Sequence, residues 1–140
     1  MSDNISEVLH KLISIYRSSI KQAANLSGVD LPITYIRSLK CIKKIPNCSA
    51  TDISHRLRLD KSQVTRIIQA LLNEGYVEKV KHPSNHRSQT LLLTVMGEKV
   101  MDVIHDIDQE MKSKMSSGLT DAQVQDFIVI ANIMINNLSD

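Results

Sequence analysis

The chain has 140 residues, which fits one domain of ordinary size, and a second full domain is not expected. Hydrophobic residues make up 42% of it and aromatic residues only 3%, and Ile, Leu, Val and Met recur at helical spacing, which is typical of a helix-rich protein. The net charge of +2 does not by itself indicate nucleic-acid binding, so that interpretation must rest on where the charges lie.

No apolar run approaches the roughly 20 residues that a membrane-spanning helix needs. The N-terminal sequence MSDNISEV also lacks the basic and apolar regions of a signal peptide. We therefore expect a cytoplasmic protein with no membrane partner.

A long amphipathic helix is predicted over residues 5–20, where apolar side chains recur at intervals of three and four residues. Polar residues and a glycine at 25–28 interrupt this pattern. Asp30 is predicted to cap a second helix that carries Pro32 in its first turn and runs to about Lys44.

Two helix starts follow in quick succession. Ser49 is followed three residues on by Asp52, and Asp60 in the same way by Gln63, which is the spacing of a capping box. The few residues around Arg58 join the two short helices, and this spacing predicts a helix-turn-helix.

The second of these helices has two different sides. Val64, Ile67 and Leu71 lie on its apolar side, and Gly75 is predicted to end it. Hydroxyls and hydrogen-bond donors on the opposite side suit the major groove of DNA, although any solvated helix also presents polar residues to water. The residues predicted to contact DNA from this helix are Lys61, Ser62, Gln63, Thr65, Arg66 and Gln69.

Two short β-patterned runs, residues 76–80 and 90–95, flank a polar, basic loop and predict the two strands of a wing. Arg87 is predicted to enter the electronegative minor groove, while the cations around it meet phosphates. In the alternative interpretation, these charges form a solvated edge that prevents strand pairing with other molecules. The residues predicted to contact DNA from the loop are Lys81, His82, His86, Arg87 and Ser88.

Two further helices complete the chain. Thr94 precedes a helix whose apolar side chains continue past Met111, and Thr120 with Gln123 opens a last helix that is apolar along most of its length. The apolar stripes of the N- and C-terminal helices exceed what the small central module can cover, so they are predicted to join a second copy in a homodimer. The alternative is a monomer in which they pack on their own domain.

The predicted fold class is therefore mainly α, a winged helix-turn-helix with long terminal dimerisation helices and a two-stranded wing. A single domain is expected over residues 1–140. Within it, 1–25 and 98–140 form the dimerisation helices and 30–97 the winged helix-turn-helix region.

The segments SATDISHRLRLDKSQVTRIIQALLNEGYVEK and HPSNHRSQTLLLTVMGEKV resemble the MarR family of winged-helix transcriptional regulators, and the resemblance covers nearly the whole chain. In the wing, that family usually has Asp, any residue, Arg and a small residue, followed by Leu-Thr and then Gly. The corresponding residues here are Asn85, His86, Arg87 and Ser88, followed by Leu93, Thr94 and Gly97. Because Asn85 replaces the acid, only a neutral hydrogen bond is available there to support Arg87.

The resemblance implies a homodimeric repressor that binds a pseudo-palindromic operator in double-stranded DNA. Each protomer would place one recognition helix in a major groove and one wing in the adjoining minor groove. The resemblance also implies a small-molecule effector that binds between the dimer helices and the winged module and shifts the spacing of the recognition helices. The candidates for lining that pocket are His10, Tyr16, Arg17, Tyr35 and Met96, each of which is otherwise an ordinary core or surface residue.

Three other functions match parts of the sequence. His82 and His86 allow a metal-responsive regulator, but they lie on a predicted loop without a nearby cluster of Cys or acidic residues. Cys48 lies just before a helix start, where partial positive charge would lower its thiol pKa and suit a redox sensor. A winged helix can also bind protein, for which an apolar or acidic recognition face is expected.

An enzyme is not expected, because the chain contains no Gly-rich phosphate loop, no HExxH helix and no GxSxG elbow. We assign no catalytic residue, no metal ligand and no cofactor.

Overall fold

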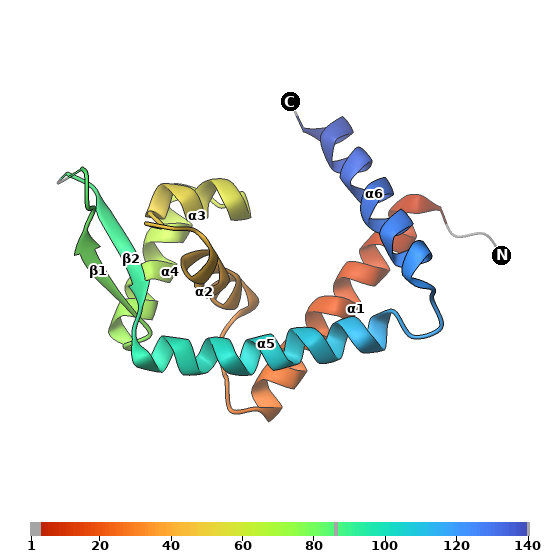
Figure 1. The fold of residues 1–140 in the computed structure, drawn as a ribbon, viewed down its shortest axis with the longest axis horizontal. Coiled ribbons are helices and arrows are strands. Elements are labelled where there is room, and N and C mark those ends of the chain that lie inside the picture. The colour runs from red at the N-terminus through yellow and green to blue at the C-terminus, as the bar shows by residue number, and fades with distance from the viewer. Residues whose placement is uncertain (1–3, 86, 140) are drawn as a thin grey trace. The chain divides into compact units, whose positions relative to one another are not determined.

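The computed structural model describes residues 4–85 and 87–139 (Figure 1). In chain order, the elements are α1 (Ile5–Leu26), α2 (Ile33–Lys44), α3 (Ala50–Leu57), α4 (Lys61–Asn73), β1 (Val77–Lys81), β2 (Gln89–Leu93), α5 (Val95–Met115) and α6 (Asp121–Leu138). This order confirms the predicted fold class, a mainly α winged helix-turn-helix with a two-stranded wing. The chain divides into two compact units, residues 1–107 and 108–140. Among the described residues, no helix combines the length and apolarity needed to span a bilayer.

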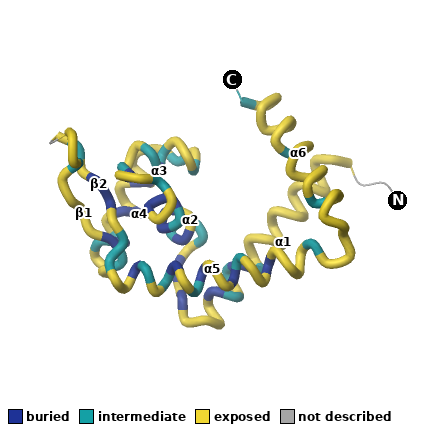
Figure 2. Tube along the Cα trace, in the orientation of Figure 1, coloured by how far each residue is buried: buried dark blue, intermediate teal, exposed yellow. Residues whose placement is uncertain are grey.

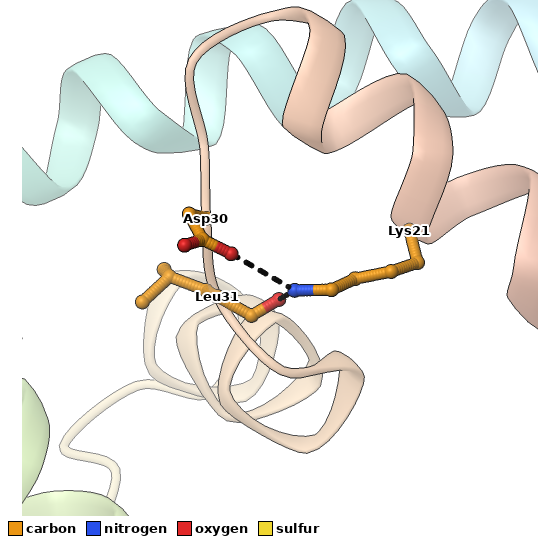
Figure 3. Close-up of polar contacts among 3 residues, drawn as sticks. All are labelled: Lys21, Asp30 and Leu31. Atoms are coloured by element: carbon orange, nitrogen blue, oxygen red, sulfur yellow. Dashed lines mark hydrogen bonds and ion pairs between the residues drawn. The ribbon is translucent and has the colours of Figure 1, made fainter.

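The connection between α1 and α2 is held by Lys21. Its Nζ donates a hydrogen bond to the carbonyl oxygen of Leu31 at 2.8 Å and lies 3.4 Å from a carboxylate oxygen of Asp30 (Figure 3). Asp30 therefore pairs with a lysine instead of capping α2, and the prediction of a cap was wrong. The N-cap position directly before Ile33 belongs to Pro32, whose ring holds φ at −58°, so Pro32 precedes the first turn.

The core of the first unit is built by α2, α3, α4, β2 and the first part of α5, where buried residues are concentrated (Figure 2). Val64, Ile67 and Leu71 are buried, which confirms the predicted inner side of α4. A core of this kind holds the helix-turn-helix at a fixed angle, because close-packed side chains resist displacement. The largest fully buried aliphatic side chains are Ile36, Leu39, Ile53, Val64, Leu71 and Ile104.

A tight turn at the end of α4 determines where the hairpin begins. Gly75 has φ +81°, and its N–H donates to the carbonyl of Leu72 at 3.1 Å. The N–H of Tyr76 donates to the carbonyl of Leu71 at 3.0 Å. These two bonds form a Schellman motif and confirm that Gly75 ends the helix. Because Tyr76 takes part in the motif, β1 begins at Val77, one residue later than predicted.

The hairpin strands pair antiparallel, with Val77 opposite Leu93. The second strand, predicted at 90–95, ends earlier, at Leu93. The reason is that the Thr94 hydroxyl accepts a hydrogen bond from the N–H of Gly97 at 3.1 Å, so that α5 begins directly after Thr94.

Thr94 also ties the hairpin to the end of α4. Its N–H donates to the carbonyl of Tyr76 at 3.1 Å, and its hydroxyl donates to the carbonyl of Gly75. Gly97 packs against the same point, since a Cβ at this position would lie 2.1 Å from the carbonyl oxygen of Tyr76. A side chain at residue 97 would therefore force the backbone to shift, because α4, the hairpin and α5 meet at one tightly packed junction.

Most residues of α1 and α6 are exposed (Figure 2), and these include most of their large apolar residues. The exposed large apolar side chains between residues 5 and 16 of α1 are Ile5, Val8, Leu9, Leu12, Ile13, Ile15 and Tyr16. None of the residues of α6, all of them described, is buried. Its exposed large apolar side chains are Phe127, Ile128, Val129, Ile130, Ile133, Met134, Ile135 and Leu138. Two helices with such surfaces need further apolar partners.

Candidate nucleic-acid interface

α4 begins with a complete capping box, as the spacing of Asp60 and Gln63 predicts. The Asp60 carboxylate accepts a hydrogen bond from the N–H of Gln63 at 2.8 Å, and the N–H of Asp60 donates to the amide oxygen of Gln63 at 3.1 Å. The hydroxyl of Ser62 also donates to this carboxylate. The Gln63 N–H, and after it the Ser62 hydroxyl, hold the pKa of Asp60 below its usual value. Because the helix start carries its own anion, we do not expect a phosphate to bind there.

The exposed side of α4 presents polar groups that are bonded within the helix. The Thr65 hydroxyl donates to the carbonyl of Lys61 at 2.8 Å, and the amide nitrogen of Gln69 donates to the side chain of Asn73 at 2.9 Å. These exposed bonds can be exchanged for bonds to DNA at small net cost, because the groups stay in polar surroundings. Together with the exposed guanidinium of Arg66, they give the helix several donors for base edges.

A groove of about 480 Å³ lies between the start of α3, the exposed side of α4 and the hairpin. A hydrogen bond joins two of these segments, since the N–H of Leu91 in β2 donates to the carbonyl of Cys48, the residue before Ser49, at 2.8 Å. The groove is lined by Ser49, Ala50, Thr51, Thr65, Ile68, Gln69, Lys79, Lys81, Arg87, Ser88, Gln89 and Leu91. Every charged residue that the structure describes in this lining is cationic, which favours a polyanion.

The structure brings some of the predicted DNA contacts together and leaves others apart. Those that line the groove are Thr65, Gln69, Lys81, Arg87 and Ser88. Those exposed on α4 outside its lining are Lys61, Ser62, Gln63 and Arg66. His86 lies outside the described residues. Ser49, Thr51 and Gln89 also line the groove but were not predicted from the sequence, because they come together only when the hairpin folds beside α3.

The wing turn is organised around His82. The Nδ1 atom of its ring accepts hydrogen bonds from the N–H groups of Ser84 and Asn85, both at 3.1 Å. Its own backbone N–H donates to the carbonyl of Ser88 at 3.1 Å. The side-chain oxygen of Asn85 accepts a bond from the N–H of Arg87 at 3.1 Å. Asn85 thus supports the backbone of Arg87 with a neutral hydrogen bond.

The Cys48 thiol is fully buried, which opposes a redox role. Burial raises its pKa to about 12, with smaller contributions in the same direction from Asp52 and Cys41. The prediction that the helix start lowers this pKa was wrong, because desolvation of the buried thiol raises it. Within residues 4–85 and 87–139, no group of three or more His, Cys, Asp and Glu side chains is arranged to hold a metal.

Another cavity, of about 460 Å³, lies between α1, α2 and α3. Its cationic lining residues are Arg17, Arg37, Lys40, Lys44 and Arg56. Its other lining residues are Ile13, Tyr16, Ile20, Ile33, Ile36, Cys41, Ile45 and Leu57. Of the residues predicted for an effector pocket, Tyr16 and Arg17 line this cavity, His10 lines a shallower hollow along α1, and Tyr35 and Met96 line neither.

A helix-turn-helix followed by a two-stranded hairpin, with hairpin cations and the second helix lining one groove, defines a winged helix-turn-helix protein. Residues 31–89, from the start of the α2 region into β2, match the MarR family. This segment of the chain thus has the winged helix-turn-helix of the MarR family.

The chain is also similar to individual regulators. The HTH-type transcriptional regulator BilQ of Clostridioides difficile is 31% identical over 87 residues, which cover 62% of this chain and 59% of that protein. The chain thus spans less than two thirds of that relative's length.

Solved structures share the fold. A MarR transcriptional regulator from Methanosarcina mazei superposes with a TM-score of 0.79 at 23% identity, covering 95% of this chain and 94% of that one. BpsR of Bordetella bronchiseptica, whose DNA binding is regulated by 6-hydroxynicotinic acid, superposes with a TM-score of 0.80 at 16% identity, covering 100% of this chain and 97% of that one. At these identities the likeness extends to the fold alone.

Proposed function

We propose that this protein regulates transcription by binding specific sequences in double-stranded DNA. The observation that carries the proposal is the groove between α3, α4 and the hairpin, whose charged lining residues are Lys79, Lys81 and Arg87. A recognition face for protein would be apolar or acidic. Residues 61–73 instead contain Arg66 and no acid, which favours DNA.

In the proposed complex, α4 lies in the major groove. The Arg66 guanidinium is suited to a bidentate bond with guanine, and the Gln69 carboxamide is suited to adenine. Arg87 reaches from the wing into the adjoining minor groove, where narrow A·T-rich sequences concentrate negative potential. Lys79 and Lys81 meet the phosphates between the two grooves.

Duplexes selected by the purified protein from a random pool should bind it saturably, and excess unrelated DNA should not displace them. Because Lys81 would neutralise about one phosphate, Lys81→Ala should lower the slope of log Kd against log salt concentration by about 0.9. Lys11→Ala removes an equal charge from α1 and should leave that slope unchanged. If no duplex is preferred over random DNA even in dilute buffer, the proposed function is wrong.

We further propose that the protein acts as a homodimer and that a second copy covers the exposed apolar side chains of α1 and α6. Ile5, at 71% exposure, and Phe127, at 58%, are examples of large side chains that a monomer would leave in water. In this arrangement residues 1–25 and 98–140 form the dimerisation helices, and 30–97 form the DNA-binding region. Two-fold symmetry then matches a pseudo-palindromic operator with half-sites about 34 Å apart.

The oligomeric state tests this proposal directly. Sedimentation equilibrium at micromolar concentration should give twice the 15.7 kDa of one chain. Ile135→Glu should shift the protein toward monomer, because the new charge would have to be desolvated in the interface. Asn136→Glu adds the same charge at the next position, on the polar side of α6, and should leave the dimer intact. A wild-type monomer under these conditions would contradict the proposal.

We also propose that the protein is a repressor and that the cavity between α1, α2 and α3 binds the effector that relieves repression. Its lining combines apolar side chains with cations and, among the described residues, includes no acid, which suits a small organic anion. The acid that regulates BpsR belongs to this chemical class. Because the cavity joins the first helix to the helix-turn-helix, an occupant that prefers one arrangement of these helices changes the spacing of the recognition helices.

A further inference from the structure

His82 accepts two backbone hydrogen bonds through one ring atom. Its Nδ1 lies 3.1 Å from the backbone nitrogen of Ser84 and 3.1 Å from that of Asn85, the second and third residues after it. This is the pattern by which Asn and Asp side chains stabilise turns, with an imidazole nitrogen in place of a side-chain oxygen. Pro83 has no N–H, so these two are the first backbone donors that the turn offers.

The tautomer of His82 follows from these bonds. A nitrogen that accepts N–H donors must keep its lone pair, so Nδ1 is unprotonated and the ring carries its hydrogen on Nε2. The two ring nitrogens of His82 therefore have different roles. Nδ1 is occupied within the turn, and only the Nε2–H is available to a phosphate.

A series of hydrogen bonds connects the ring of His82 to the backbone of Arg87 through Asn85. Asn85, whose N–H is held by the imidazole, accepts a bond from the N–H of Arg87 on its side-chain oxygen at 3.1 Å. The carbonyl of Asn85 accepts a bond from the N–H of Ser88 at 3.0 Å. The carbonyl of Ser88 accepts the backbone N–H of His82 at 3.1 Å, which closes the loop. The backbone of Arg87 is thus bonded to Asn85, which itself belongs to a closed set of bonds that includes the ring of His82.

We propose that His82 is a positioning residue of the wing, which acts through Asn85 to present Arg87 to DNA, and not primarily a phosphate contact. This inference rests on the proposed DNA-binding function. It differs from the prediction made from sequence, where His82 is one of several cations around the loop. In the structure, the neutral ring and its Nδ1 lone pair are what the turn uses.

Two substitutions separate the two ring nitrogens. His82→Asn places an oxygen near the position of Nδ1 and removes the Nε2 donor, whereas His82→Gln keeps a donor near Nε2 and loses the acceptor at the Nδ1 position. If His82 positions the wing, His82→Gln should weaken binding to a selected duplex about fivefold to tenfold, and His82→Asn should restore most of that affinity. In an Arg87→Ala background, His82→Gln should cause little further loss.

A measurement on the free protein tests the turn without DNA. The amide hydrogens of Ser84 and Asn85 should exchange slowly in the wild type and in His82→Asn, and faster in His82→Gln. Wild-type affinity in His82→Gln together with weakened binding in His82→Asn would overturn the proposal in favour of a phosphate contact. Equal exchange rates in all three proteins would overturn it as well. If the wild-type protein instead shows no preference for any duplex, the proposed function is wrong, whatever the amide exchange rates are.

Discussion

Replacing Gly97 with alanine is expected to lower the free energy of unfolding by about 1–3 kcal/mol, the cost typical of overpacking in a well-packed region. The added Cβ would lie 2.1 Å from the carbonyl oxygen of Tyr76. That oxygen cannot easily move, because it accepts the N–H of Thr94, and the N–H of Tyr76 itself is bonded to Leu71 in the turn that ends α4. The strain should also shift the root of the wing and weaken DNA binding.

Urea denaturation of three variants distinguishes this contact from other effects. Gly75→Ala meets no atom within 4 Å but is held at φ +81°, so it should cost about 1 kcal/mol through backbone strain alone. Lys99→Ala, at an exposed position in α5, should change stability by less than about 0.5 kcal/mol. An unfolding midpoint for Gly97→Ala equal to that of Lys99→Ala would show that the junction is less tightly packed than the structure indicates.

Arg66→Ala and Arg87→Ala should each weaken binding to the selected operator about tenfold to a hundredfold, which corresponds to about 1–3 kcal/mol per arginine–base contact. Both side chains are exposed, so the unfolding midpoint should not change. The two losses should differ in kind. Arg66→Ala should relax the base preference at one position in the major groove, whereas Arg87→Ala should reduce the preference for a narrow, A·T-rich minor groove.

A charge-conserving variant provides the control. Arg66→Lys keeps the positive charge but loses the planar pair of donors that matches guanine. It should therefore retain the salt dependence of the wild type while losing most of its base preference. Competition binding with operator variants at several salt concentrations measures both quantities. Unchanged affinity in both alanine variants would exclude the docking geometry proposed for α4 and the wing.

Features that depend on a few neighbouring residues were predicted correctly from the sequence. The capping boxes of Ser49 with Asp52, Asp60 with Gln63, and Thr120 with Gln123 all form as their spacing indicates. Gly75 ends α4 as expected. In each case the interacting residues lie within about one helical turn of one another, so a short segment of sequence is enough to predict the interaction.

Features that depend on contacts between distant segments were missed or predicted wrongly. Asp30 pairs with Lys21 of the preceding helix, which competes with its capping role. The pKa of Cys48 is raised because the residue is buried by segments far from it in the chain, which local reasoning about a helix start cannot include. The DNA contacts and the effector pocket remain predictions.

The amino-acid sequence by itself determined the helix-turn-helix, the hairpin and the polar side of α4, because periodicity and capping are properties of short segments. Only the tertiary structure decided that Ser49 and Thr51 share a groove with the wing, since that depends on the bond between Leu91 and Cys48. The tertiary structure also decided that the His82 ring accepts hydrogen bonds within the turn. The reason is that the role of an imidazole depends on which N–H donors the folded backbone places near its lone pair.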